Sequence, residues 1–174
     1  MSVVCNNDYE TKLFRAAFSL GFHGFMRVGE LSVGSKNNQM YTVAIENINM
    51  FDNKLEVLLT SSKTDQVGAG TTICISSQRD KNVCPVRLMA NYIKDRPPYP
   101  GPLFCHEGNQ ITRYQVLALL KRSLSILGIE HNGIRTHSFR IGMATTCSVE
   151  GIPDEQIKKL GRWKSEAYLC YIRI

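Results

Sequence analysis

The spacing of apolar and polar residues predicts that the chain begins with a helix. Between residues 9 and 22, apolar side chains recur every three or four positions, at Leu13, Phe14, Ala17, Phe18 and Phe22. This spacing places them on one stripe of an amphipathic helix that faces a core. A glycine then interrupts the pattern, and the run "GFMRVGEL" (24–31) predicts a second, short helix.

The pattern changes to short β-branched and alternating runs between residues 40 and 77. Three runs, 40–50, 54–62 and 71–77, are separated by "FDN" and by the glycine-bearing "KTDQVGAG". Runs of this length between turn residues are typical of strands. They predict three antiparallel strands in one small sheet.

Helical patterning returns after Cys84 and continues to the C-terminus. Pro85 suits the first turn of a helix, which "KDRPPYPGP" (94–102) ends. Thr112 and Gln115 form a capping box for the next helix, which we expect to end near Gly128. Further helices are predicted over 136–151 and 153–161, and 165–174 completes the chain. The predicted fold is α+β and mainly helical, with one inserted sheet.

Composition narrows the class of protein without identifying it. The 174 residues, 43% of them hydrophobic, predict a single domain over 1–174. Lys and Arg exceed Asp and Glu by 21 − 15 = 6, which favours a polyanionic partner. No apolar run is long enough to cross a membrane, and no signal peptide is visible, so we expect an intracellular protein.

The six cysteines are scattered singly, which predicts free thiols in a reducing compartment. Cys84, Cys105 and His106 have the side-chain types of a zinc site. They lack the close-spaced pairs of structural zinc sites, so ordinary cysteines are favoured.

Two pairs of polar residues have the spacing of one helix face. Arg27 and Glu30 lie three residues apart, so the carboxylate can orient the guanidinium, although such a pair alone is usually a surface ion pair. His137 and Arg140, in "HSFR", stand at a predicted helix start beside Arg135. Hydrogen-bond donors at a helix N-terminus form a suitable binding site for a phosphate.

Other candidates carry chemistry only in combination. Lys63 is expected at the tip of the predicted hairpin, where a lysine is normally solvated but can also reach into a groove and donate a proton. Trp163, Tyr168 and Tyr171 follow in the last segment, where aromatic residues usually pack in a core.

Taken in order, these residues resemble the catalytic domain of a tyrosine recombinase of the phage integrase family. The resemblance lies in Arg27 with Glu30, Lys63 in a strand-to-strand turn, "HSFR", "LGRWKS" and a tyrosine near the C-terminus. The segments "GFMRVGEL" and "GRWKSEAYLCYIR" are similar in sequence to those of Crypton and DIRS-like mobile-element recombinases of eukaryotes. For such a host the expected location is the nucleus.

The resemblance implies cleavage and rejoining of double-stranded DNA through a 3′-phosphotyrosyl intermediate on Tyr171. Arg27 and Arg140 would bind the phosphate, and Glu30 would orient Arg27. His137 would donate to the phosphate or help remove the phenol proton. Lys63 would protonate the leaving 5′ oxygen, and Trp163 would bind a phosphate oxygen and pack beneath Tyr171. Arg135 and Lys164 would contact DNA. No metal, cofactor or small-molecule substrate is expected.

The register near the C-terminus leaves two alternatives. If Gly161 is aligned with the glycine that precedes this position in the family, Arg162 fills the position that is His or Trp in other members. Aligned on "WKS", Trp163 fills it, and this register is preferred because the residue type matches. Tyr168 is the alternative nucleophile, disfavoured because it stands only 168 − 163 = 5 residues after Trp163.

Family members usually carry an N-terminal core-binding domain and a helix after the tyrosine, and we expect both to be absent here. In a full-length protein, a tetramer on DNA is expected. A catalytically silent DNA-binding remnant is the alternative function. A type IB topoisomerase is a third, disfavoured because those enzymes resemble the chain less closely around "HSFR".

Overall fold

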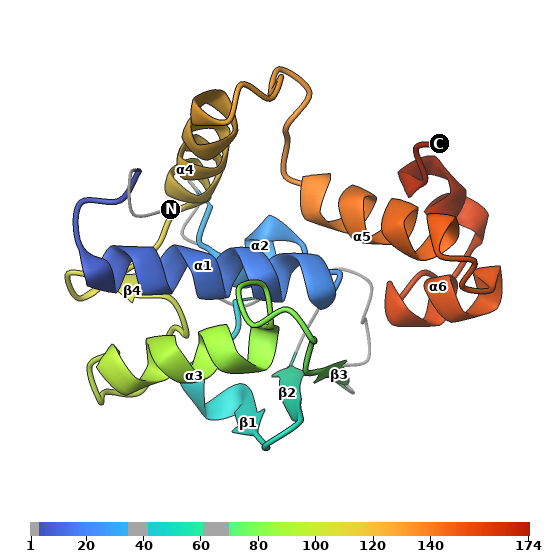
Figure 1. The fold of residues 1–174 in the computed structure, drawn as a ribbon. Coiled ribbons are helices and arrows are strands. Elements are labelled where there is room, and N and C mark those ends of the chain that lie inside the picture. The colour runs from blue at the N-terminus through green and yellow to red at the C-terminus, as the bar shows by residue number, and fades with distance from the viewer. Residues whose placement is uncertain (1–3, 35–41, 61–69) are drawn as a thin grey trace.

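A computed structural model describes residues 4–34, 42–60 and 70–174 of the chain. Helix α1 (Asp8–His23) crosses the centre of the fold, and α3 (Pro85–Asp95) lies against it, as Figure 1 shows. The predicted stripe of α1 faces the core, with Leu13 and Ala17 fully buried. Asn7 caps this helix by accepting a hydrogen bond from the backbone N–H of Glu10 at 2.8 Å.

The three-stranded sheet has the antiparallel order β1-β2-β3, which confirms the prediction. Its strands are β1 (Ile48–Met50), β2 (Lys54–Leu59) and β3 (Thr71–Ser76). β1 is shorter than predicted because Ile45–Asn47 forms the 3-10 helix η2. There the Asn47 side chain accepts from the backbone N–H of Ala44 at 3.3 Å, and this local bond competes with strand pairing.

A second, two-stranded sheet was missed by the sequence analysis. Strands β4 (Cys105–His106) and β5 (Asn109–Gln110) pair through a turn at Glu107 and Gly108, both with positive φ. Such a two-residue turn favours glycine, so Gly108 is the signal that locates it. The strands are too short to produce a hydrophobic period.

The C-terminal helices gather at one end of α1. Helices α5 (Ser138–Val149) and α6 (Asp154–Leu160) lie there with the 3-10 helix η3 (Glu166–Tyr171), which forms most of the last segment (Figure 1). The short helix α2 (Val28–Leu31) follows α1. A small cluster of buried side chains (Phe25, Ala144, Cys147, Ile157, Tyr168) joins α5, α6 and η3 to the end of α1.

Helix α4 (Arg113–Ile126) stands apart from this end of the molecule (Figure 1). Thr112 and Gln115 form the predicted capping box, and Ile111 and Val116 are both fully buried at its start. In the described residues, no helix has the length and apolar character needed to cross a membrane. All six cysteines are unpaired.

Candidate active site

Glu30 lies at the centre of the candidate site. Its side chain is buried, with the residue 3% exposed. One carboxylate oxygen accepts from the backbone N–H of Arg27 at 2.9 Å, and the other accepts from Nη1 of Arg27 at 3.0 Å. The same carboxylate therefore fixes the start of α2 and the direction of the Arg27 guanidinium.

Arg162 reaches the same carboxylate from the other end of the chain. Its Nη2 donates to Oε2 of Glu30 at 3.0 Å and to the backbone carbonyl of Phe25 at 3.3 Å. Burial lowers the pKa of Arg162, and the Glu30 carboxylate acts in the opposite direction. Glu30 thus holds two guanidinium groups that are 135 residues apart in sequence, since 162 − 27 = 135.

Arg140, in the first turn of α5, is the largest fully buried side chain of the described residues. Its Nη1 donates to the carbonyl of Phe25 at 2.8 Å, and its Nη2 donates to the carbonyl of Gly161 at 2.7 Å. Burial, with the charges of Arg27 and Arg162, lowers the pKa of Arg140 to about 10. The group is therefore still a cation at neutral pH.

Two aromatic rings lie over the Arg140 guanidinium. Its carbon is 4.3 Å from the centre of the Trp163 ring and 5.6 Å from the centre of the Tyr171 ring. The centres of the Trp163 and Tyr171 rings are 5.0 Å apart. Tyr168, by contrast, is buried, at 3% exposure, and packs on Trp163 with ring centres 6.3 Å apart.

His137 precedes α5 and lies beside the tyrosine. Its ring meets the Tyr171 ring edge-on, with centres 5.8 Å apart. Partial burial lowers its pKa from the ordinary 6.5, and the charges of Arg140 and Arg27 lower it further. The imidazole is therefore mostly neutral at neutral pH, which lets it accept a proton.

The structure brings together five of the candidate catalytic residues of the sequence analysis, namely Arg27, His137, Arg140, Trp163 and Tyr171. Glu30 lies with them, and Arg162, the alternative in the register near the C-terminus, joins them. Arg135 and Lys164 are exposed on nearby turns. Lys63 lies outside the described residues.

The backbone contributes two parts of the site that the sequence analysis missed. The carbonyl of Phe25 accepts from both Arg140 and Arg162, and the carbonyl of Gly161 accepts from Arg140. Gly161 is also needed sterically, because a Cβ there would overlap the Trp163 ring. The glycine before Arg162 is the one signal in the sequence that points to this turn.

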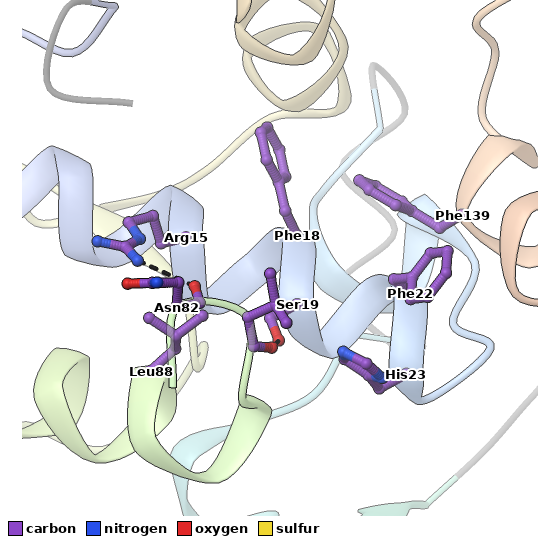
Figure 2. Close-up of a pocket in the computed structure, with 9 residues that line it drawn as sticks. Arg15, Phe18, Ser19, Phe22, His23, Asn82, Leu88 and Phe139 are labelled. Carbon is purple, nitrogen blue, oxygen red and sulfur yellow. Dashed lines mark hydrogen bonds between the residues drawn. The ribbon is translucent and has the colours of Figure 1, made fainter. Parts of the chain in front are cut away.

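No three His, Cys, Asp or Glu side chains of the described residues are placed to hold a metal ion. A pocket of about 410 Å³ beside α1 is mainly apolar and contains none of the candidate catalytic residues (Figure 2). Phe18, Phe22 and Phe139 line it, and Arg15 bonds to the backbone of Asn82 at its rim.

Comparison with known proteins finds relatives of this chain. The family model described as "Phage integrase family" matches residues 4–171. A protein of Selenomonas ruminantium described as an integrase/recombinase xerD homolog is 24% identical over 159 residues. The match covers 87% of this chain and 44% of the relative.

Solved structures confirm the predicted fold class. The XerH site-specific recombinase bound to difH substrate, in a pre-cleavage complex, superposes with a TM-score of 0.73 at 15% identity. That match covers 99% of this chain and 46% of XerH. The Tn1549 transposon integrase in complex with circular intermediate DNA gives 0.59 at 13% identity, over 99% of this chain and 57% of the integrase.

The chain therefore spans about half the length of these relatives. These comparisons do not support the closer likeness to Crypton and DIRS-like recombinases that the residues around Arg27 and Tyr171 suggest.

Proposed function

The chain belongs to the phage integrase family, and from this premise we propose that it cleaves and rejoins DNA strands with Tyr171 as the nucleophile. The observation that carries the proposal is the convergence of Arg27, His137, Arg140 and Tyr171 from three separate parts of the chain. Two guanidinium groups, an imidazole and a phenol at one place have the chemistry that phosphoryl transfer to a tyrosine requires.

The phenol oxygen of Tyr171 attacks the phosphorus of a phosphodiester, and the bond from phosphorus to the 5′ oxygen breaks. The products are a 3′-phosphotyrosyl protein and a free 5′-hydroxyl. A 5′-hydroxyl of another strand reverses the step, and the tyrosine is released. Since the energy of the broken bond is kept in the phosphotyrosyl link, no nucleotide cofactor is needed.

The guanidinium groups stabilise the negative charge that gathers on the non-bridging oxygens in the transition state. Arg27 is oriented for this by Glu30, and Arg140 by two backbone carbonyls. Donors held in place before the reaction cost no reorganisation during it, and the loss of one such donor costs about 3 kcal/mol. These cations replace the charge that a metal ion supplies in other phosphoryl transfers, so we propose a metal-independent reaction.

Two proton transfers complete the proposed step. The phenol proton of Tyr171 passes to His137, which is placed against the tyrosine ring and is neutral at neutral pH. The departing 5′ oxygen takes a proton from Lys63, a role assigned from its place between β2 and β3 in the sequence. Trp163 packs against both Arg140 and Tyr171.

Double-stranded DNA is the proposed partner. The net charge of +6 favours a polyanion, and the exposed Arg135 and Lys164 flank the site. The structures that this fold resembles are described as recombinases or integrases on DNA. In the full-length protein we propose assembly as a tetramer on its substrate.

Covalent capture tests the proposal. The protein is incubated with a random-sequence pool of duplexes that carry a nick in one strand, so that cleavage releases a short fragment and traps the intermediate. We expect a protein–DNA adduct that survives SDS and is unchanged by EDTA. Tyr171→Phe should abolish the adduct, and Tyr168→Phe should retain it. Failure of wild type to form an adduct, or an adduct with Tyr171→Phe, contradicts the proposed mechanism.

A catalytically silent DNA-binding protein is the second candidate, and the burial of Arg140 favours it. That guanidinium is 0% exposed and already bonded to two carbonyls, so a phosphate reaches it only after the covering rings move. Salt-dependent DNA binding without any adduct would select this alternative.

A further inference from the structure

The arginine cluster around Glu30 carries more positive charge than its one carboxylate can balance. Arg27 and Arg162 bond to Glu30, while Arg140 and Arg162 share the Phe25 carbonyl. Three guanidinium groups and one carboxylate give a local charge of 3 − 1 = +2. Buried charge without a partner is costly, so this excess favours a bound anion.

We infer that Arg162 is a third phosphate-binding guanidinium beside Arg27 and Arg140, and so a further catalytic residue. The catalytic role of Arg162 rests on the proposed function, whereas its binding of phosphate does not. The three arginines would then surround one phosphodiester, whose transition state carries close to two negative charges. The local excess of +2 matches that charge.

Unpartnered donors support the inference. Among the described residues, three buried side-chain nitrogen or oxygen atoms have no hydrogen-bond partner, and two of these are Nε of Arg140 and Nη1 of Arg162. A buried donor without an acceptor costs about 1–3 kcal/mol. Such atoms are rare in folded proteins, and two in neighbouring arginines indicate an acceptor that binds from outside the chain.

The backbone at Arg162 gives independent support. The N–H of Trp163 bonds to the carbonyl of Lys158 at 3.0 Å, and that of Arg162 bonds to Lys159 at 3.1 Å. These two bonds form a Schellman motif after α6, in which the residue at the position of Arg162 is usually glycine. Arg162 instead adopts φ of 58° with a full side chain. An arginine held in this left-handed conformation is strained, which is typical of functional positions.

A groove gives a ligand access beside Arg162. A pocket of about 520 Å³ lies between β3 and α6, and Arg162 lines it. Its walls carry the hydroxyl, amide and ammonium donors of Thr71, Thr72, Gln156 and Lys159 together with the apolar side chains of Ile73, Cys74 and Leu160. The donor groups among them suit the oxygens of a sugar–phosphate strand.

Trp163 provides a direct measurement of phosphate binding, because it is the one tryptophan of the chain and touches Arg140. Inorganic phosphate is titrated at constant ionic strength while tryptophan emission is followed. We expect a saturable change in wild type. Arg162→Gly should raise the phosphate dissociation constant at least tenfold, and Arg162→Lys should raise it less. Arg79→Gly, in an exposed loop, is the matched control and should leave it unchanged.

Glycine is chosen because it suits a positive φ, so Arg162→Gly relieves the backbone while removing the guanidinium. Thermal unfolding of each variant shows that it is folded. Dissociation constants are read from the midpoints of the phosphate titrations, which do not depend on the emission intensity of the free protein. Equal phosphate affinity in wild type and Arg162→Gly, or no saturable change in wild type, would overturn the inference.

The catalytic part is tested on a duplex recovered from the covalent capture. Arg162→Gly should slow adduct formation about 100-fold or more on the normal phosphate. A methylphosphonate lacks one charged oxygen, so the loss on that substrate should be clearly smaller. Equal losses on both substrates contradict a catalytic role. Phosphate binding that depends on Arg162 without any adduct contradicts the proposed function and leaves the phosphate site standing.

Discussion

The guanidinium carbon of Arg140 lies 4.3 Å from the centre of the Trp163 ring. Arg162, the residue before Trp163, pairs with Glu30. The two residues that the sequence offered for one position therefore occupy two different positions around the arginine cluster. Trp163 packs on the Arg140 guanidinium, and Arg162 adds another guanidinium to the cluster.

Removal of the Trp163 ring should destabilise the fold as well as the site. Trp163→Ala leaves a cavity against Arg140, Phe25 and Tyr171 and removes a cation–π contact, so we expect a loss of about 3 kcal/mol in the free energy of unfolding. Trp163→Phe keeps a ring over the cation and should lose less. Urea unfolding followed by circular dichroism measures both. Equal losses for the two variants would show that the contact with Arg140 adds nothing beyond volume.

The Glu30 carboxylate should contribute far more to stability than a surface carboxylate. Glu30→Gln leaves the guanidinium groups of Arg27 and Arg162 without a counter-charge in a buried place, and we expect a loss of about 3 kcal/mol. Glu56→Gln is the matched control, because Glu56 pairs with the more exposed Lys54 at 2.7 Å. It should cost less than about 1 kcal/mol. Similar losses by chemical denaturation would contradict the central role of Glu30.

Gly161 should tolerate no side chain. In Gly161→Ala the added methyl group would overlap the Trp163 ring and force it away from Arg140. Overpacking of this kind costs about 1–3 kcal/mol, and the covalent adduct should be reduced with it. Gly133→Ala adds the same methyl group with no atom within 4 Å and should leave thermal unfolding and adduct yield unchanged. Normal adduct yield in Gly161→Ala would show that the Trp163 position is unimportant for reaction.

Strong local patterns made most of the fold predictable. The amphipathic stripe of α1, the capping box at Thr112 and the alternation in β2 and β3 depend on neighbours in sequence, and the structure agrees with each. The β4–β5 hairpin was missed because two-residue strands carry no period. The last segment was predicted as helical without a helix type, and it forms a 3-10 helix, because residue spacing does not distinguish the two types over so short a run.

The candidate site was predictable from ordered motifs only in part. Arg27, Glu30, His137, Arg140 and Tyr171 are each named by a short motif in the sequence. The carbonyl of Phe25 has no such signal, because a backbone acceptor is selected by the fold and any residue type carries one. The pairing of Arg162 with Glu30 likewise depends on the left-handed turn after α6.

The pH dependence of adduct formation should reveal which proton transfer His137 performs. Its pKa is lowered from 6.5 by partial burial and by Arg140 and Arg27, so it accepts a proton at neutral pH. A general base acts in its neutral form, and the rate should therefore be constant near pH 7 and fall in proportion to acidity below the lowered pKa. A proton donor would give the opposite slope. His137→Gln should remove this fall in rate at low pH, while His131→Gln, which lies outside the cluster, should keep it.

Stability must be followed in the same experiment, because burial also lowers the pKa of His23. A histidine with a lowered pKa binds fewer protons in the folded state than in the unfolded state. The free energy of unfolding then falls as the pH drops below about 6.5, where unfolded histidine takes up its proton. Thermal unfolding at each pH separates this loss from a catalytic one. A rate that falls only where the protein unfolds, with the same profile in His137→Gln, would contradict general-base catalysis by His137.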